Sequence, residues 1–208
     1  MDLEKVNENL RSKTPREIIE WALQYGNKPV VTTNFRPYEA NILHACVSVR
    51  KEIPVIWCDT GYNTTYTYSY AEKIIKELAL DVRLYTPLKT ALYRDSSSKI
   101  PRVDSSLHAE FTEQVKLEPF RRAMKEHQPD IWFTNLRKGQ TALRDSLDVI
   151  SKSADGVLKV SPFYYWTDEE LDAYLAKYKL ENETRYFDPT KVFGNRECGL
   201  HIATNPQK

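Results

Sequence analysis

The sequence has almost no net charge, few cysteines and no long apolar run. Its 30 basic and 29 acidic residues leave a formal charge of +1, too little to recruit nucleic acid or an anionic membrane. No run of about 18 apolar residues occurs, so no transmembrane helix is expected. Residues 1–14 are polar and mixed in charge, unlike a signal peptide. Three cysteines without an export signal predict reduced thiols and a cytoplasmic location.

What remains is typical of a folded α/β chain. The hydrophobic share is 41%, and 13 Tyr and 4 Trp argue against disorder. Runs rich in β-branched residues predict strands at 29–34, 53–58, 81–85, 130–134 and 157–160. Apolar periodicity and capping boxes predict intervening helices at 38–49, 68–80, 118–127 and 167–177, and one that begins after Thr14. Residues 88–110 are expected to form an irregular surface segment.

Strands alternating with helices predict an α/β fold with a mostly parallel sheet of five to six strands flanked by helices. Ligands bind such sheets outside the carboxyl ends of the strands, near a switch in strand order. The polar tips at 32–36, 59–62 and 135–144 are therefore the expected binding region. We expect one α/β domain over residues 1–185, followed by a mobile C-terminal tail at 186–208.

The segment 196–201, Arg-Glu-Cys-Gly-Leu-His, contains the candidate nucleophile Cys198. A thiolate is favoured by nearby positive charge, which Arg196 and His201 can supply. The alternatives are a small residue in a polar tail, or a Cys/His metal pair, for which no second pair lies nearby. Cys46 lies in an apolar helix and is expected to be structural, whereas Cys58 ends an apolar strand at the ligand side and its role stays open.

Three further segments are candidates for binding an anionic nucleotide. The basic tip at 137–144 can hold phosphate or sulfate by charge-assisted bonds, although a solvated basic turn would have the same composition. The turn 59–62, Asp-Thr-Gly-Tyr, allows close backbone approach and ring stacking, or is an ordinary turn. Lys116 and Arg122 lie in a charged helical segment that could face the ligand or solvent.

Taken together, four segments resemble the sulfonucleotide reductases, specifically the 3′-phosphoadenylyl sulfate (PAPS) reductase family. They are Asp-Thr-Gly-Tyr at 59–62, Lys-x-Glu-Pro-x-x-Arg-Ala at 116–123, Trp-Phe-x-x-Leu-Arg-x-x-Gln-x-x-x-Arg at 132–144, and Arg-Glu-Cys-Gly-Leu-His at 196–201. The resemblance runs from about Val30 to His201 and implies an adenine nucleotide alpha hydrolase-like fold.

The resemblance also implies the chemistry. Cys198 would attack the sulfur of PAPS, releasing adenosine 3′,5′-bisphosphate and leaving a Cys S-sulfonate from which thioredoxin or glutaredoxin releases sulfite. Arg196 and His201 would assist it, and the enzyme would be a homodimer. The implied substrate-binding residues are Thr33, Phe35, Arg36, Asp59, Thr60, Gly61, Tyr62, Lys116, Arg122, Arg137, Lys138, Gln140 and Arg144.

Two departures and one absence refine this expectation. The family's first loop, usually Ser-Phe-Gly-x-Gln, is here Asn34-Phe35-Arg36-Pro37-Tyr38, and the stretch before the tail motif is short. No Cys-Cys pair exists, so we expect no iron–sulfur cluster and no metal. Adenylyl sulfate or another sulfonucleotide is the alternative substrate, and a nucleotide-binding relative without turnover is the alternative function. ATP-dependent adenylation is disfavoured because the glycine-rich loop it uses is missing.

Overall fold

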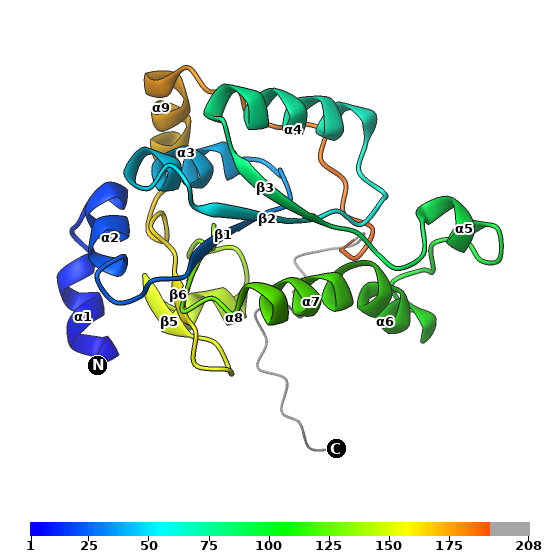
Figure 1. Ribbon diagram of the computed structural model, residues 1–208, viewed down its shortest axis with the longest axis horizontal. Coiled ribbons are helices and arrows are strands. Elements are labelled where there is room, and N and C mark those ends of the chain that lie inside the picture. Colours follow the sequence, from blue (N-terminus) through cyan, green and yellow to red (C-terminus); the bar gives the residue numbers. More distant parts are fainter. Residues whose placement is uncertain (192–208) are drawn as a thin grey trace.

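The computed structural model describes residues 1–191, which form one α/β unit around a single sheet (Figure 1). The six strands are β1 (Pro29–Thr33), β2 (Pro54–Cys58), β3 (Asp81–Tyr85), β4 (Ile131–Phe133), β5 (Ile150–Lys152) and β6 (Leu158–Val160). Their order is β3-β2-β1-β4-β6-β5, and every neighbouring pair is parallel except β5–β6. The predicted fold class, a mostly parallel sheet flanked by helices, is confirmed.

The helices are α1 (Leu3–Leu10), α2 (Pro15–Ala22), α3 (Glu39–Val49), α4 (Thr65–Leu78), α5 (Ala91–Asp95), α6 (Leu107–Thr112), α7 (Glu118–His127), α8 (Ala142–Asp145) and α9 (Asp168–Tyr178). A π-helical turn, η1 (Glu113–Leu117), joins α6 to α7. The capping boxes of α2 and α9 form as expected, with Thr14 and Thr167 each bonded to a glutamate three residues later. No helix of this described part is long and apolar enough to cross a membrane.

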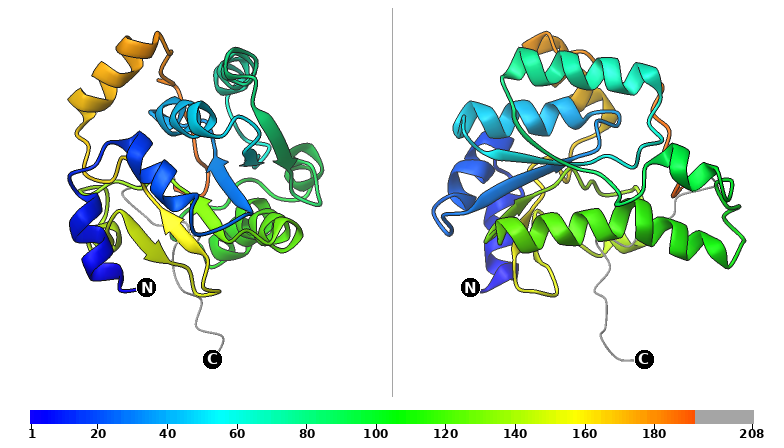
Figure 2. Two further views of the ribbon diagram at one scale, coloured as in Figure 1. Left: turned by 60° about the vertical axis from the view of Figure 1, so that its left-hand side comes forward. Right: turned by 45° about the vertical axis from the view of Figure 1, so that its right-hand side comes forward.

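Helices cover the sheet on both faces. Helices α3 and α4 lie over one face and α7 lies over the other (Figure 2). Alternate residues of a strand serve the two faces, so Val31 joins the core under α3 while its neighbour Val30 packs toward α7. Burial on both faces explains why β1, β2 and β4 are nearly continuous apolar runs.

The sheet has a topological switch point between the parallel strands β1 and β4. The chain builds outward from β1 to β2 and β3, and then crosses back to place β4 on the other side of β1. The connections leaving the carboxyl ends of β1 and β4 therefore separate, and a cavity can form between them.

Candidate functional site

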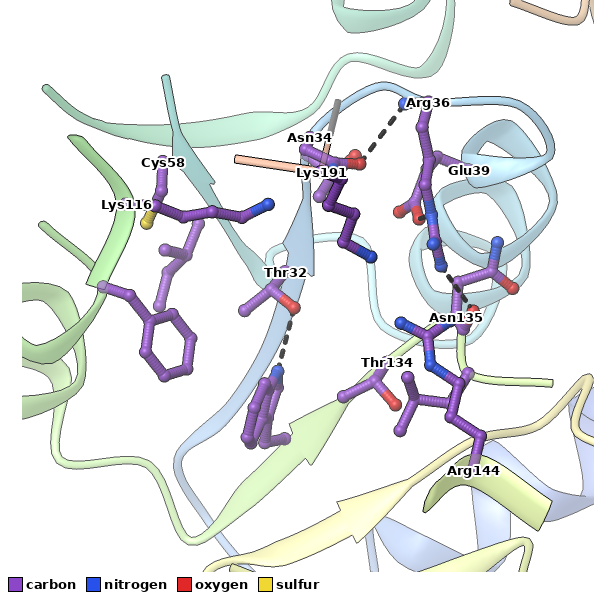
Figure 3. A pocket seen from close by; sticks show the side chains of 15 residues that line it. Thr32, Asn34, Arg36, Glu39, Cys58, Lys116, Thr134, Asn135, Arg144 and Lys191 are labelled. Atoms are coloured by element: carbon purple, nitrogen blue, oxygen red, sulfur yellow. Dashed lines mark hydrogen bonds and ion pairs between the residues drawn. The ribbon is translucent and has the colours of Figure 1, made fainter. Parts of the chain in front are cut away.

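A cavity of about 70 Å³ lies at this switch point. Its walls come from the tips of β1 and β4, the end of β2, the η1–α7 junction and the first turn of α3 (Figure 3). The lining residues are Thr32, Thr33, Asn34, Arg36, Glu39, Ile56, Cys58, Lys116, Phe120, Trp132, Thr134, Asn135, Leu136, Arg144 and Lys191. Two of the three strand tips expected to bind a ligand, 32–36 and 135–144, thus line a hollow in the structure, whereas residues 59–62 lie outside its lining.

The lining of this cavity is strongly basic. Arg36, Lys116, Arg144 and Lys191 contribute positive charge, and Glu39 is the one acid among the described lining residues. Figure 3 shows the charged ends of Lys116, Lys191 and Arg144 directed into the same space from three different elements. An excess of cations within a recess with apolar walls attracts an anionic ligand even though the whole chain is almost neutral.

Lys116 is held in the cavity wall by a buried ion pair. It lies on η1, and π-helical turns are frequent at functional sites because they redirect side chains. Its Nζ is 2.5 Å from Asp188 Oδ2 and 3.3 Å from the Thr190 hydroxyl. Burial acts to raise the pKa of Asp188, but Lys116 and the bonds from Thr190 outweigh it and lower that pKa. This pair anchors the segment that leads directly to Lys191.

The loop after β1 has an unusual backbone. Phe35 and Tyr38 adopt left-handed conformations, with φ of 52° and 66°, a region that residues with side chains rarely occupy. Phe35 is fully buried against Trp57, with ring centroids 4.8 Å apart. The Tyr38 amide donates to Asn182 Oδ1 at 2.8 Å. These contacts hold a loop whose strain costs on the order of 1–3 kcal/mol per residue.

The basic residues after β4 differ in whether their side chains line the cavity. Arg144 is 3% exposed, bonds to the Gln140 side chain and lines the cavity. Arg137 instead pairs with Asp168 at 2.5 Å. The Lys138 ammonium lies over the ring of Tyr165, 5.5 Å from its centroid.

The tip of β2 is hydrogen-bonded within the chain. Asp59 accepts from the Tyr68 hydroxyl at 3.0 Å, from Asn63 Nδ2 at 2.9 Å and from the Gly61 amide at 3.0 Å. Gly61 has φ of 81°, which suits a residue without a side chain. The Tyr62 hydroxyl donates to Asp95 at 2.6 Å.

Four of the predicted substrate-binding residues line the cavity, namely Thr33, Arg36, Lys116 and Arg144. The others lie outside its lining: Phe35, Asp59, Thr60, Gly61, Tyr62, Arg122, Arg137, Lys138 and Gln140. Arg122 bonds to Glu118 at 2.9 Å and to the carbonyl of Thr86 at 2.7 Å. Cys198, Arg196 and His201 lie outside the described residues. The roles of all these residues stay predictions.

Several polar lining residues were not among the predicted ones. They are Thr32, Asn34, Glu39, Thr134, Asn135 and Lys191. Thr32, Asn34 and Asn135 fall within the strand tips that the topology singles out, so their position was a usable signal. Glu39 had a weaker signal, an acid three residues after Arg36 at the start of a helix. Lys191 lies in a stretch without helical or strand periodicity, and nothing in the sequence indicated that it would line the cavity.

The two cysteines that the structure describes, Cys46 and Cys58, have raised thiol pKa values, unlike a reactive cysteine. Cys46 is fully buried in α3, as predicted, and burial raises its pKa. Cys58 lines the cavity, and burial raises its pKa to about 12 despite the opposing effect of Lys116 and Arg122. Both are protonated thiols at neutral pH, and a protonated thiol is a poor nucleophile. Within residues 1–191 there is no group of three or more His, Cys, Asp or Glu side chains that could hold a metal ion.

Comparison with known proteins places this geometry in a family. The chain is 30% identical to a phosphoadenosine 5′-phosphosulfate reductase of Xylella fastidiosa (strain M12), over 96% of this chain and 94% of that protein. A phosphoadenylyl-sulfate reductase of Candida auris, solved as a phosphate complex, shares the fold with a TM-score of 0.73 at 24% identity, covering 86% of each chain. The fold also resembles an FMN adenylyltransferase of Candida glabrata (TM-score 0.57, 11% identity, 78% of this chain and 52% of that one).

The family model for the phosphoadenosine phosphosulfate reductase domain matches residues 28–197, the greater part of the chain. This span contains every strand of the sheet and every described residue that lines the basic cavity. The chain therefore belongs to the phosphoadenosine phosphosulfate reductase family of oxidoreductases.

Proposed function

We propose that this enzyme reduces PAPS to sulfite and adenosine 3′,5′-bisphosphate, with Cys198 as the nucleophile and thioredoxin or glutaredoxin as the reductant. The observation that carries the proposal is the basic cavity at the β1–β4 switch point, in a chain of this family. Lys116 and Arg144 would hold the phosphosulfate and stabilise the charge that develops on the leaving phosphate. The alternative substrate, adenylyl sulfate, would use the same cations.

Cys198 is close enough along the chain to reach the cavity. Lys191 lines it, and Cys198 follows seven residues later. An extended chain covers at most about 3.5 Å per residue, or roughly 25 Å over this length. The other two cysteines are protonated by burial, which leaves Cys198 as the candidate thiolate.

The proposed reaction has two steps. The Cys198 thiolate attacks the sulfonate sulfur, a sulfur–sulfur bond forms, and the sulfur–oxygen bond breaks with its electron pair going to the leaving phosphate. A thiolate of the reductant then attacks Cys198 Sγ and expels sulfite with the electron pair of the sulfur–sulfur bond. The second thiol of the reductant resolves the mixed disulfide, regenerates Cys198 and completes the two-electron transfer.

The proposal includes no iron–sulfur cluster, because three separated cysteines cannot supply the four thiolates that such a cluster takes from one chain. It also includes a cytoplasmic location, where thiols stay reduced, and a homodimer.

Intact-protein mass spectrometry tests the proposal. Pre-reduced protein is incubated with PAPS in the absence of reductant, and then with thioredoxin. The expected result is one added SO₃ group that maps to Cys198 and leaves as sulfite when thioredoxin is added. Cys198→Ser should form no adduct, whereas Cys46→Ala, a matched change in the core, should still form it.

Each other outcome of this experiment has a definite meaning. An adduct with adenylyl sulfate but not with PAPS would replace the substrate and keep the mechanism. No adduct with either nucleotide would contradict the proposal and favour a nucleotide-binding protein without turnover.

A further inference from the structure

Two buried oxygen atoms in the cavity wall lack a hydrogen-bond partner. They are Glu39 Oε2 and Asn135 Oδ1, on residues that are 3% and 5% exposed. Both residues line the cavity. A buried acceptor left without a donor is costly, so native structures seldom keep one without a reason. The position of these two atoms indicates that a bound molecule supplies the missing donors.

The neighbouring atoms fix the two acceptors in place. Glu39 Oε1 accepts from Arg36 Nε at 2.8 Å, which leaves Oε2 for another donor. Arg36 Nη2 reaches across to the Asn135 carbonyl at 2.8 Å. Asn135 Nδ2 donates to the carbonyl of Tyr38 at 3.2 Å, and this bond identifies the remaining amide atom as the acceptor oxygen. Arg36 therefore joins the β1 loop to the β4 tip.

The acceptor pair restricts what can bind beside it. A carboxylate and an amide oxygen take hydrogen bonds from O–H or N–H groups and oppose a phosphate at the same place. The cations of the cavity, Lys116 and Arg144, attract the anionic part of the ligand into the same small space. The donor must therefore lie close to the anionic group in the ligand. In PAPS the 2′-hydroxyl of the sugar meets this condition, since the 3′ position carries a phosphate, whereas the amino group of the base lies farther away.

We infer that Glu39 and Asn135 form a sugar-hydroxyl subsite of the nucleotide, and that Arg36 is a positioning residue for Glu39. This inference rests on the proposed sulfonucleotide chemistry and adds a specificity determinant to it. The first loop, which departs from the family pattern at Arg36, places the Arg36 guanidinium 2.8 Å from the Glu39 carboxyl group inside the wall. Burial raises the pKa of Glu39 above its ordinary value, and Arg36 opposes this effect only in part.

Equilibrium binding of paired nucleotides, measured by titration calorimetry, tests the subsite without requiring turnover. One pair is adenosine 3′,5′-bisphosphate and its 2′-deoxy analogue, and the other is adenosine 5′-monophosphate and its 3′-deoxy analogue. The wild-type enzyme should bind the 2′-deoxy analogue about tenfold or more weakly than its parent, because a hydrogen bond to a buried acceptor is lost. A penalty confined to the 3′-deoxy analogue would instead place the acceptors where PAPS carries its 3′-phosphate, and would overturn PAPS as the substrate in favour of adenylyl sulfate.

The variants locate the effect. Glu39→Ala should reduce the deoxy penalty to less than about twofold, and the isosteric Glu39→Gln should leave a smaller penalty than the wild type because an amide has one acceptor oxygen where the carboxyl group has two. Arg36→Met should also reduce the deoxy penalty, because Glu39 loses the group that positions it. If Arg36 only stabilised the fold, its replacement would leave the ratio of the two affinities unchanged. Glu77→Gln, an exposed glutamate on α4 outside the cavity, is the matched control and should keep it.

Three outcomes would overturn the inference. Nucleotide binding with no penalty for either deoxy analogue in the wild type overturns it and leaves the proposed function standing. A penalty that persists unchanged in folded Glu39→Gln and Glu39→Ala places the hydroxyl contact elsewhere. Failure of every nucleotide to bind overturns the inference and the proposed function together.

Discussion

The strand tips at one edge of the sheet differ in how their polar groups are used. At the tips of β1 and β4 the side chains line a basic cavity, and two acceptors there have no partner. At the tip of β2 the corresponding polar groups bond to one another, with Asp59 accepting from Tyr68, Gly61 and Asn63. Both regions carry polar side chains at the carboxyl ends of neighbouring strands, on the same edge of the sheet.

The difference shows how binding residues can be distinguished from structural ones. A polar side chain whose hydrogen-bonding capacity is used inside the chain stabilises a turn, whereas one that lines a cavity with capacity left over can recognise a ligand. Lys116 combines features of both, because it lines the cavity and its ammonium is paired with Asp188. The predictions below test whether this distinction holds.

Replacing Lys116 should have the largest effect, and on stability. In Lys116→Met the Asp188 carboxylate stays buried without its cation, and breaking a buried pair from one side costs about 3–5 kcal/mol. Urea unfolding at neutral pH should show this loss, and the double variant Lys116→Met/Asp188→Asn should recover much of it. A loss below about 1 kcal/mol in the single variant would show that the pair does not hold this wall.

Arg144 and Arg137, seven positions apart, should differ in nucleotide affinity. Arg144→Met removes a cavity-lining guanidinium, and charged hydrogen bonds contribute about 1.5–3 kcal/mol, so the Kd for adenosine 3′,5′-bisphosphate should rise roughly 10- to 150-fold. Arg137→Met removes an ion pair to the exposed Asp168 and should change the Kd less than about threefold. Titration calorimetry measures both. Equal effects would mean that the whole basic turn binds the ligand.

Much of this architecture could be predicted from local sequence. The strands at Pro29–Thr33 and Pro54–Cys58 are apolar runs because both faces of the sheet are covered, and such runs are easily recognised. The start of α2 followed from the capping box at Thr14 and Glu17, a pattern that depends on residues three positions apart. Features that depend on neighbouring residues were therefore predictable.

The elements that sequence reasoning missed depend on distant contacts. Strand β5 has three residues and forms because Ile150 pairs with β6 and bonds to Asn7, which lies on α1. Helix α1 is tied to the same place by that buried asparagine, and nothing near it in sequence indicates this. The segment 88–110, expected to be irregular, contains α5 and the start of α6, whose exposed Leu92 and Leu107 give no periodic core pattern.

The site was predictable as a region and only partly as a set of residues. Topology placed ligands at the strand tips, and Thr33, Arg36 and Arg144 lie there in the cavity wall. Sequence could not tell that the Asp59 side chain turns inward, because its partner Tyr68 is nine residues away on another element. It also could not reveal that Glu39 Oε2 lacks a hydrogen-bond partner. That feature depends on a contact between residues far apart in sequence, in which Arg36 on the β1 loop bonds to the carbonyl of Asn135 after β4.

Asp59 should matter for stability and little for affinity. Asp59→Ala leaves the partly buried donors of Tyr68, Asn63 and Gly61 without their acceptor, and each such loss costs on the order of 1–3 kcal/mol where water cannot replace it. Denaturant unfolding should show a loss in this range, with the Kd for adenosine 3′,5′-bisphosphate changed less than about threefold. A Kd raised tenfold in folded protein would instead assign Asp59 to the ligand.

The smallest expected effect is at Tyr62. Tyr62→Phe keeps the ring beside Phe111 and removes a hydroxyl that donates to Asp95 and accepts from Arg94, a loss of about 1 kcal/mol in the free energy of unfolding.

The effect of Tyr62→Phe should also depend on pH. Burial, followed by the bond to Asp95, raises the pKa of Tyr62 above its ordinary value of about 10. The hydroxyl's contribution is therefore fully present below about pH 10 and is lost as the pH rises through the higher pKa of the folded state. The difference in unfolding free energy between the wild type and Tyr62→Phe should stay constant from pH 6 to pH 9 on this basis. A difference that grew toward alkaline pH would contradict the raised pKa of Tyr62. It would require that Arg94 lower this pKa and that the turn stabilise the tyrosinate anion.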